Sequence, residues 1–122
     1  MNGATLKITR DRQQTANGDL LVVEVDGDLD MATADRFAAG LEADGEAEIR
    51  AVVVDLTSVA FIDSSGIREL LRADRDLGEA GYRCGVVVVE GSAVARALEL
   101  SGVIPTVTTF PTRDQAVDEL AG

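Results

Sequence analysis

The apolar positions near the start of the chain follow the spacing of strands. Leu6 and Ile8 alternate with polar residues, and a turn-forming segment at 15–19 leads into an apolar, β-branched run at 20–25. Two such runs joined by a short segment containing Asn, Gly and Asp are typical of a β-hairpin. We therefore expect an antiparallel pair of strands on one side of a sheet.

Two later runs are apolar without alternation. Residues 51–54 and 85–89 are almost entirely valine, the pattern of strands that are buried on both faces. The first run is expected to lie centrally in the sheet and to end at Asp55, which would turn the following loop. A weaker edge strand is predicted at 107–110. The phenylalanines Phe37, Phe61 and Phe110 are expected in the core.

Between these runs, apolar residues recur at intervals of three and four, which indicates amphipathic helices. Residues that cap helices or stop them delimit each helix. Four helices are expected: from the 30–34 segment to Leu41, from the 63–65 segment to Gly81, from Ser92 to Gly102, and from Thr112 to Leu120. A hairpin followed by strands alternating with helices predicts an α/β fold with a mixed sheet. At 122 residues, we expect a single domain over 1–122.

Composition then narrows the possible functions. Twenty-two acidic residues against eleven basic ones give a net charge of −11, which repels nucleic acids and anionic membranes. The chain has no histidine and one cysteine, Cys84, so it lacks the usual general base and a cysteine cluster for a metal. We expect no enzymatic activity, no metal and no cofactor. No apolar stretch fits a membrane span or a signal peptide, which favours a cytoplasmic protein without a nucleic-acid or membrane partner.

The segment 61–67, Phe-Ile-Asp-Ser-Ser-Gly-Ile, has more polar side chains than one helix start needs. Asp63, Ser64 and Ser65 all favour the N-cap position, which takes only one of them. If Asp63 caps the helix, Ser64 is its first residue, with a hydroxyl near solvent. Gly66 would leave room for another chain. Because a helix N-terminus tolerates phosphate, Ser64 is a candidate for phosphorylation.

Three segments together resemble the anti-sigma factor antagonists of the STAS domain superfamily. The segment 54–67 resembles the signature around their acceptor serine. The Gly-Asp-Leu-Asp turn at 27–30, followed by 33–34, is similar to their turn before the first helix, and 98–103 resembles a later segment. The similarity extends from about Leu20 to the C-terminus.

This resemblance implies a phosphoprotein that regulates transcription by switching partners. The unmodified protein would bind an anti-sigma factor that is itself a serine kinase, and so free the sigma factor. Phosphorylation of Ser64 would release the kinase, and a PP2C-type phosphatase would restore the protein. ATP and magnesium would belong to the kinase. The residues expected to bind the partner are Asp30, Thr33, Asp63, Ser65, Gly66, Ile67 and Arg68.

Other interpretations remain open at this point. The same module, never phosphorylated, could be a scaffold in a signalling or transporter-associated assembly. A response-regulator receiver would use Asp55 as its acceptor, but it needs a late lysine and the only lysine is Lys7. A serine hydrolase would need a base that this chain lacks. Arg68 and Glu69 depart from the small and aliphatic residues common in the antagonists, which alters the expected docking face.

Overall fold

The computed structural model describes residues 6–43, 48–103 and 106–122, in which five strands and four helices are present. The expected fold class and the four helices are confirmed. The elements, in order, are β1 (Leu6–Thr15), β2 (Gly18–Leu29), α1 (Ala34–Gly40), β3 (Ile49–Ile62), α2 (Ser64–Glu79), β4 (Arg83–Val87), α3 (Ala93–Leu100), β5 (Thr109–Phe110) and α4 (Arg113–Ala121).

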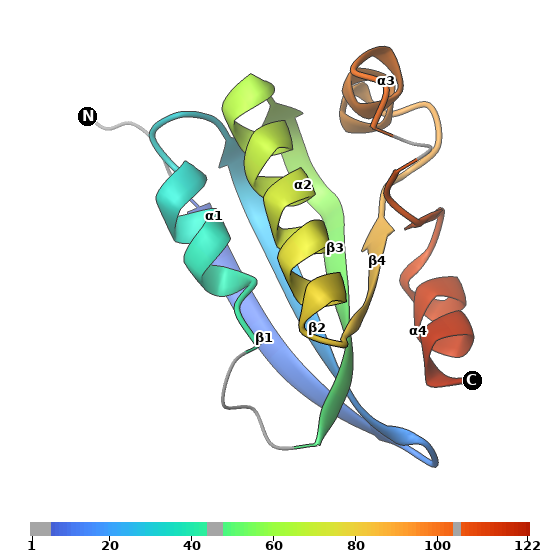
Figure 1. The fold of residues 1–122 in the computed structure, drawn as a ribbon. Coiled ribbons are helices and arrows are strands. Elements are labelled where there is room, and N and C mark those ends of the chain that lie inside the picture. Colours follow the sequence, from blue (N-terminus) through green and yellow to red (C-terminus); the bar gives the residue numbers. More distant parts are fainter. Residues whose placement is uncertain (1–5, 44–47, 104–105) are drawn as a thin grey trace.

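The five strands form one mixed sheet in the order β1-β2-β3-β4-β5. The β1–β2 pair is the predicted antiparallel hairpin, and β2, β3, β4 and β5 run parallel to one another. β3 is central, as expected from its buried valines. Because the carboxyl ends of parallel strands lie at one edge of a sheet, the loops after β2, β3 and β4 meet at the same end of the molecule (Figure 1).

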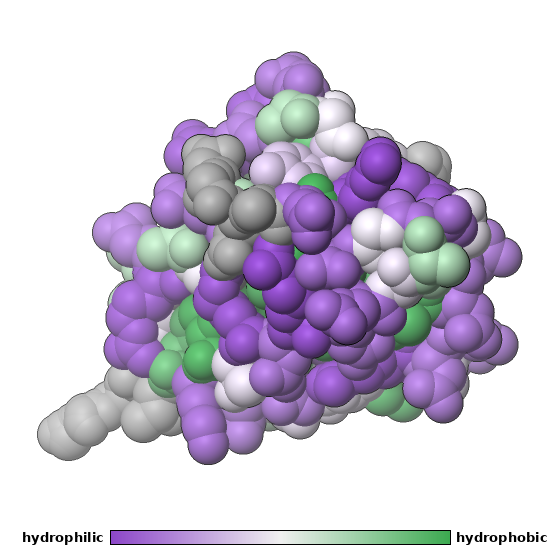
Figure 2. All heavy atoms as spheres, turned by 90° about the horizontal axis from the view of Figure 1, so that it is seen from below, coloured by the Kyte–Doolittle hydropathy of each residue, from purple (hydrophilic) through white to green (hydrophobic). Residues whose placement is uncertain are grey.

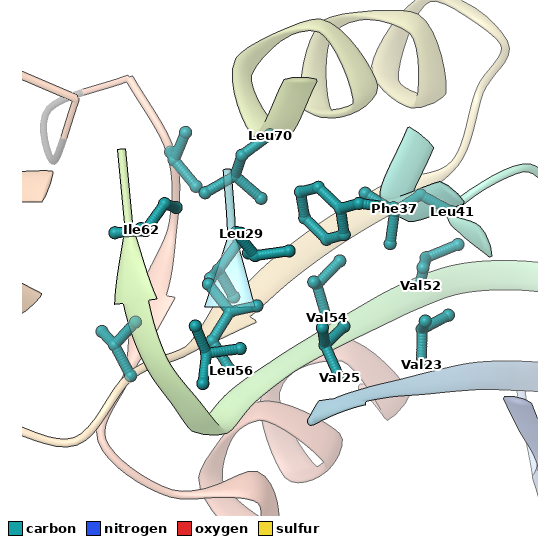
Figure 3. Close-up of a cluster of buried hydrophobic side chains, with 14 of the residues drawn as sticks. Val23, Val25, Leu29, Phe37, Leu41, Val52, Val54, Leu56, Ile62 and Leu70 are labelled. Atoms are coloured by element: carbon teal, nitrogen blue, oxygen red, sulfur yellow. The ribbon is translucent and has the colours of Figure 1, made fainter. Parts of the chain in front are cut away.

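The side chains of the strands alternate between two apolar layers. Val23, Val25, Val52 and Val54 face the larger core, where Phe37 of α1 packs over them together with residues of α2 and α3 (Figure 3). Ala116 and Leu120 of α4 cover the smaller core on the opposite face, which is formed by the alternate strand positions Leu20, Val22, Ala51, Val53 and Val87. The sheet is thus covered by helices on both faces, but α4 covers only the part around these residues.

The strand predicted to end at Asp55 instead continues to Ile62, so the expectation that Asp55 lies in a loop is wrong. After an irregularity in the register, the outer half of β3 pairs with the outer half of β2, from Asp26↔Ser58 to Leu29↔Ile62. The polar residues Thr57 and Ser58 interrupt the apolar pattern, and this concealed the extension. Two other strands also differ: β4 covers 83–87, and β5 only 109–110.

Local signals located the helix ends well. The side chains of Asp63, Ser92 and Thr112 each accept a hydrogen bond from an amide in the first turn of α2, α3 and α4. At the end of α2, Gly81 has a φ of +96°. The amides of Gly81 and Tyr82 donate to the carbonyls of Gly78 and Leu77, which is a Schellman termination.

The end of α4 contacts the turn of the hairpin, far along the sequence. Nδ2 of Asn17 donates to the carbonyl of Ala121 at 2.9 Å. The guanidinium of Arg83 donates to the carbonyls of Leu120 and Glu119. These donors satisfy carbonyls that have no partner within the helix. Figure 1 shows this end of the molecule opposite to the start of α2.

Candidate functional site

The candidate site lies where β3 leads directly into α2, at the carboxyl end of the sheet. The amide of Asp63 donates to the carbonyl of Leu29 at 2.9 Å, which joins the end of β2 to the start of α2. Oδ1 of Asp63 accepts from the amides of Ser65 at 2.8 Å and Gly66 at 3.2 Å. Among the three candidates, Asp63 is therefore the N-cap, the case in which Ser64 is the first residue of the helix.

Ser64 is the first residue of α2 and its side chain is exposed. Its hydroxyl is therefore accessible to an incoming enzyme. The amides of Ser65 and Gly66 already donate to Asp63, so two of the donors expected to receive a phosphate are occupied. A phosphate on Ser64 would be a neighbour of the Asp63 carboxylate and would gain little from these amides.

The turn after β2 is held by a small hydrogen-bond network. Oδ1 of Asp30 accepts from the amides of Ala32 at 2.9 Å and Thr33 at 3.2 Å. The hydroxyl of Thr33 donates to the carbonyl of Asp28 at 2.7 Å and accepts from the amide of Asp30 at 3.0 Å. Thr33 is fully buried. Although it stands at the N-cap of α1, its hydroxyl fixes this turn and does not cap the helix.

Gly66 has a different role from the one predicted. A Cβ at this position would lie 2.8 Å from Cβ of Leu29, 2.9 Å from Cγ1 of Ile62 and 2.9 Å from the carbonyl oxygen of Leu29. These distances are shorter than real Cβ contacts, so only glycine lets α2 approach the end of β2. The space at Gly66 is filled by this chain itself and is not open to another.

The residues predicted to bind a partner divide by exposure. Ser64 and Arg68 are exposed, and Asp30, Asp63 and Ser65 are partly exposed. Thr33, Gly66 and Ile67 are buried and support this surface from beneath, while partner binding by the seven residues stays a prediction. The structure thus brings the 30–33 turn and the start of α2 together, as predicted.

Sequence reasoning missed two exposed apolar residues at the same end of the molecule. Phe61, expected in the core, is 51% exposed, and Met31 in the turn after β2 is 81% exposed. Ile62, which follows Phe61, is buried beneath α2. Since successive strand residues point to opposite faces, the burial of Ile62 directs Phe61 away from the core. Recognising that β3 extends to Ile62 would have revealed this.

A second polar cluster lies in the sheet between β2, β3 and α4. Asp55 is buried, and its Oδ2 accepts from Nε of Arg113 at 2.8 Å. Nη2 of Arg113 also contacts Oδ2 of Asp55 at 2.7 Å and donates to Oε2 of Glu24 at 2.9 Å. Hydrogen bonding to Asp55 is the main cause that raises the pKa of Arg113. With its carboxylate so engaged, Asp55 is poorly placed to be the phosphoryl acceptor of a receiver.

Other kinds of site find no support in the part of the chain that the structure describes. Over residues 6–43, 48–103 and 106–122, no group of three or more Cys, Asp or Glu side chains is arranged to hold a metal ion. None of the helices in the same ranges is long and apolar enough to cross a membrane.

Comparison with known proteins identifies the family. The family model described as STAS domain matches residues 11–116, so the chain belongs to the STAS domain family. Anti-sigma-F factor antagonist RsfB of Mycobacterium tuberculosis (strain H37Rv) is 33% identical over 104 residues, which are 83% of this chain and 81% of that protein.

Solved structures agree with this assignment. The crystal structure of an anti-sigma factor antagonist from Mycobacterium paratuberculosis has a TM-score of 0.77 and 28% identity, and covers 95% of this chain and 96% of that one. The phosphorylated form of SpoIIAA, a Bacillus cell fate determinant, has a TM-score of 0.59 and 20% identity over 91% of this chain and 98% of that one. At this identity the second match supports the fold alone.

Proposed function

We propose that this protein is an anti-sigma factor antagonist whose binding is switched off by phosphorylation of Ser64. The observation that carries the proposal is the exposed hydroxyl of Ser64 on the first residue of α2, at an end of the molecule whose backbone is fixed by hydrogen bonds. Membership of the STAS family and the 33% identity to an anti-sigma-F factor antagonist support it.

The geometry explains why modification would change binding and not folding. Asp63 caps α2 through its own carboxylate, and the Ser64 side chain is exposed, so a phosphate needs no rearrangement of the core. It adds about −1.5 to −2 charges at neutral pH to a surface that already carries Asp63, Asp30 and Asp28. A docked kinase would meet the added bulk and charge directly, above all where it still holds the phosphates of a nucleotide.

In this scheme the chain supplies a surface and an acceptor, and the chemistry belongs to its partners. The anti-sigma factor kinase would bind ATP and magnesium and transfer the phosphoryl group to Oγ of Ser64. The unmodified antagonist would hold that kinase and leave the sigma factor free to act. A PP2C-type phosphatase would remove the phosphate and return the protein to its binding form.

The test is phosphate transfer by purified anti-sigma factor kinases encoded in the same genome, with ATP and magnesium, followed by mass spectrometry of the product. Phosphate is expected on Ser64. Ser64→Ala should accept none and bind the kinase constitutively, whereas Ser64→Asp should bind weakly. Ser65→Ala is the matched control and should still accept phosphate.

Two outcomes would contradict the proposal. Normal phosphate uptake by Ser64→Ala would move the acceptor to another residue. Stable binding of an anti-sigma factor with no phosphate transfer from any kinase would instead favour the scaffold interpretation, in which Ser64 is never modified. Unchanged far-ultraviolet circular dichroism of both Ser64 variants would show that the fold is not the cause of a binding defect.

A further inference from the structure

We propose that Met31 and Phe61 are the apolar anchors that hold the anti-sigma factor on either side of Ser64. This inference rests on the proposed function and specifies the surface that the partner must carry. Only four large apolar side chains of the described ranges are exposed: Met31, Phe61, Val89 and Leu100. Two of the four belong to the segments that meet at the start of α2.

Phe61 lies on a part of the sheet that none of the four described helices covers. α4 packs on the inner halves of the strands, over residues such as Val22 and Val53. Its first residue, Arg113, is bonded to Glu24 and Asp55. On β3 beyond that point, four side chains are exposed: Thr57, Ser58, Ala60 and Phe61. The phenyl ring therefore stands on an open sheet surface, three residues before Ser64.

Met31 lies on the other side of the site, in the turn between β2 and α1. Its neighbours Asp30 and Thr33 fix the backbone of this turn through four hydrogen bonds of 2.7–3.2 Å. The side chain itself is 81% exposed, nearly as much as a residue can be in a folded chain. The fixed turn therefore presents this apolar side chain to a partner at one defined place.

The two segments form one rigid unit. The amide of Asp63 donates to the carbonyl of Leu29, and Gly66 packs against the same residue. Asp28 and Phe61 are direct cross-strand partners, so the β2 turn and the end of β3 cannot move independently. Because the backbone is already ordered, a partner loses little affinity in fixing this surface.

The charges around the anchors indicate the chemistry of the partner. Carboxylates of Asp26, Asp28, Asp30 and Asp63 line the β2 turn and the start of α2, and the cations near them include Lys7, Arg36 and Arg68. The surface thus combines two apolar side chains with an excess of negative charge. A complementary partner surface has apolar pockets rimmed by Arg or Lys, which would also speed association at low salt.

The described residues at the opposite end of the molecule present a different surface. Seen from below, it is mostly hydrophilic, and its apolar atoms are in small separate areas (Figure 2). The termination of α2, the hairpin turn and the end of α4 lie there, and their polar groups bond to one another within the chain. This difference between the surfaces of the two ends favours docking of the partner at the end that carries Ser64.

The test measures binding of the anti-sigma factor kinase that transfers phosphate to Ser64. Met31→Ala and Phe61→Ser are each expected to weaken the Kd roughly tenfold or more, as truncation of an anchor does. Leu100→Ala is the matched control: Leu100 is also 81% exposed but belongs to α3 and to neither of the two anchor segments, so the Kd of this variant should stay within about twofold of wild type. All three variants should keep the wild-type Tm, since none of these side chains is in the core.

Charge is tested separately with Asp28→Asn. This variant should lower the association rate and flatten its dependence on salt. The proposal would be overturned if Met31→Ala and Phe61→Ser bind as tightly as wild type. It would also be overturned if Phe61→Ser changes only self-association of this chain, because the patch would then belong to a second copy.

Failure of this inference and failure of the proposed function give different results. If the wild-type protein binds the kinase and accepts phosphate on Ser64, but neither anchor variant changes the Kd, only the anchors are wrong. If the wild-type protein binds none of the kinases and Ser64 accepts no phosphate, the proposed function itself is refuted and the anchor proposal with it.

Discussion

Cys84 shows how one side chain is controlled by its surroundings. It packs beside the larger core, and its thiol donates to the carboxylate of Asp74 on α2. Burial first, and then the charge and the hydrogen bond of Asp74, raise the pKa of Cys84 to about 12. The thiol is therefore protonated and unreactive at neutral pH, because the thiolate is the nucleophile.

We predict that Cys84 reacts with iodoacetamide at pH 8 roughly a thousandfold more slowly in the folded protein than in urea, where its pKa is about 8.5. Ionisation favours the unfolded chain, so stability should fall as pH rises from about 9 towards 12. Mass spectrometry of timed samples measures the rate. Asp74→Asn should react faster; an unchanged rate would mean that Asp74 does not restrain the thiol.

At this scale, prediction from sequence succeeded where the relevant contact is local. Asp63 was identified as a cap because a cap bonds to amides two and three residues away. Phe61 was assigned to the core wrongly, because its exposure depends on where α4 begins on the far side of the sheet. The structural roles of Thr33 and Gly66 depend on contacts with residues 28–30. The sequence alone does not show that these segments lie next to one another.

Among the elements, α2 carries two glycines with opposite structural roles. Gly66 lies against Leu29 and Ile62, with no space for a Cβ. Gly78, near the other end of the helix, has nothing within 4 Å of the position that a Cβ would take. One glycine permits close packing, and the other is a cost in helix propensity alone.

Alanine at each position therefore gives a matched pair. Gly66→Ala should lower the free energy of unfolding by about 1–3 kcal/mol, because α2 must move away from the end of β2. Gly78→Ala should raise it by up to about 1 kcal/mol through helix propensity. Urea denaturation measures both. Equal effects of the two changes would show that the predicted crowding at Gly66 is relieved without cost.

The elements also show what periodicity can and cannot reveal. The helix boundaries were predicted to within a few residues, because apolar spacing and capping residues are both local features of the sequence. β3 was predicted with under half its length: Thr57 and Ser58 face the open part of the sheet, where no apolar residue is required. β5 is only two residues long, so its own sequence could not distinguish it from the loop around it.

For the whole molecule, the cluster of Arg113, Asp55 and Glu24 fastens the last helix to the sheet. Asp55 is only 2% exposed, and Arg113 supplies two nitrogens to its Oδ2. The amide of Thr57 is a further donor to Asp55, at 2.9 Å. Without Arg113, the buried carboxylate would lose its strongest hydrogen-bond partner, which is costly in a low-dielectric interior.

Arg113→Met should therefore reduce the free energy of unfolding by about 1–3 kcal/mol. Glu24→Gln is the control, because Glu24 is partly exposed and exposed ion pairs contribute under about 1 kcal/mol. Urea denaturation again provides the values. If both variants lose the same amount, the buried pair is no stronger than a surface pair.

The overall architecture was predictable in class but not in detail. The alternation of strands and helices gave a mixed sheet with a central valine-rich strand. The strand order was not deduced, and neither was the pairing of Asp55 with Arg113, because each joins segments that are distant in sequence. The contact between the hairpin turn and the end of α4 was not predicted either, for the same reason.

That last contact has a practical consequence. Asn17 and Arg83 donate hydrogen bonds to the last carbonyls of α4. Residue 122 therefore lies at the end of the molecule opposite to Ser64 (Figure 1). A biotin or a fluorescent dye attached after Gly122 would point away from the surface under study. The protein could then be immobilised on a sensor chip with the acceptor serine facing the solution.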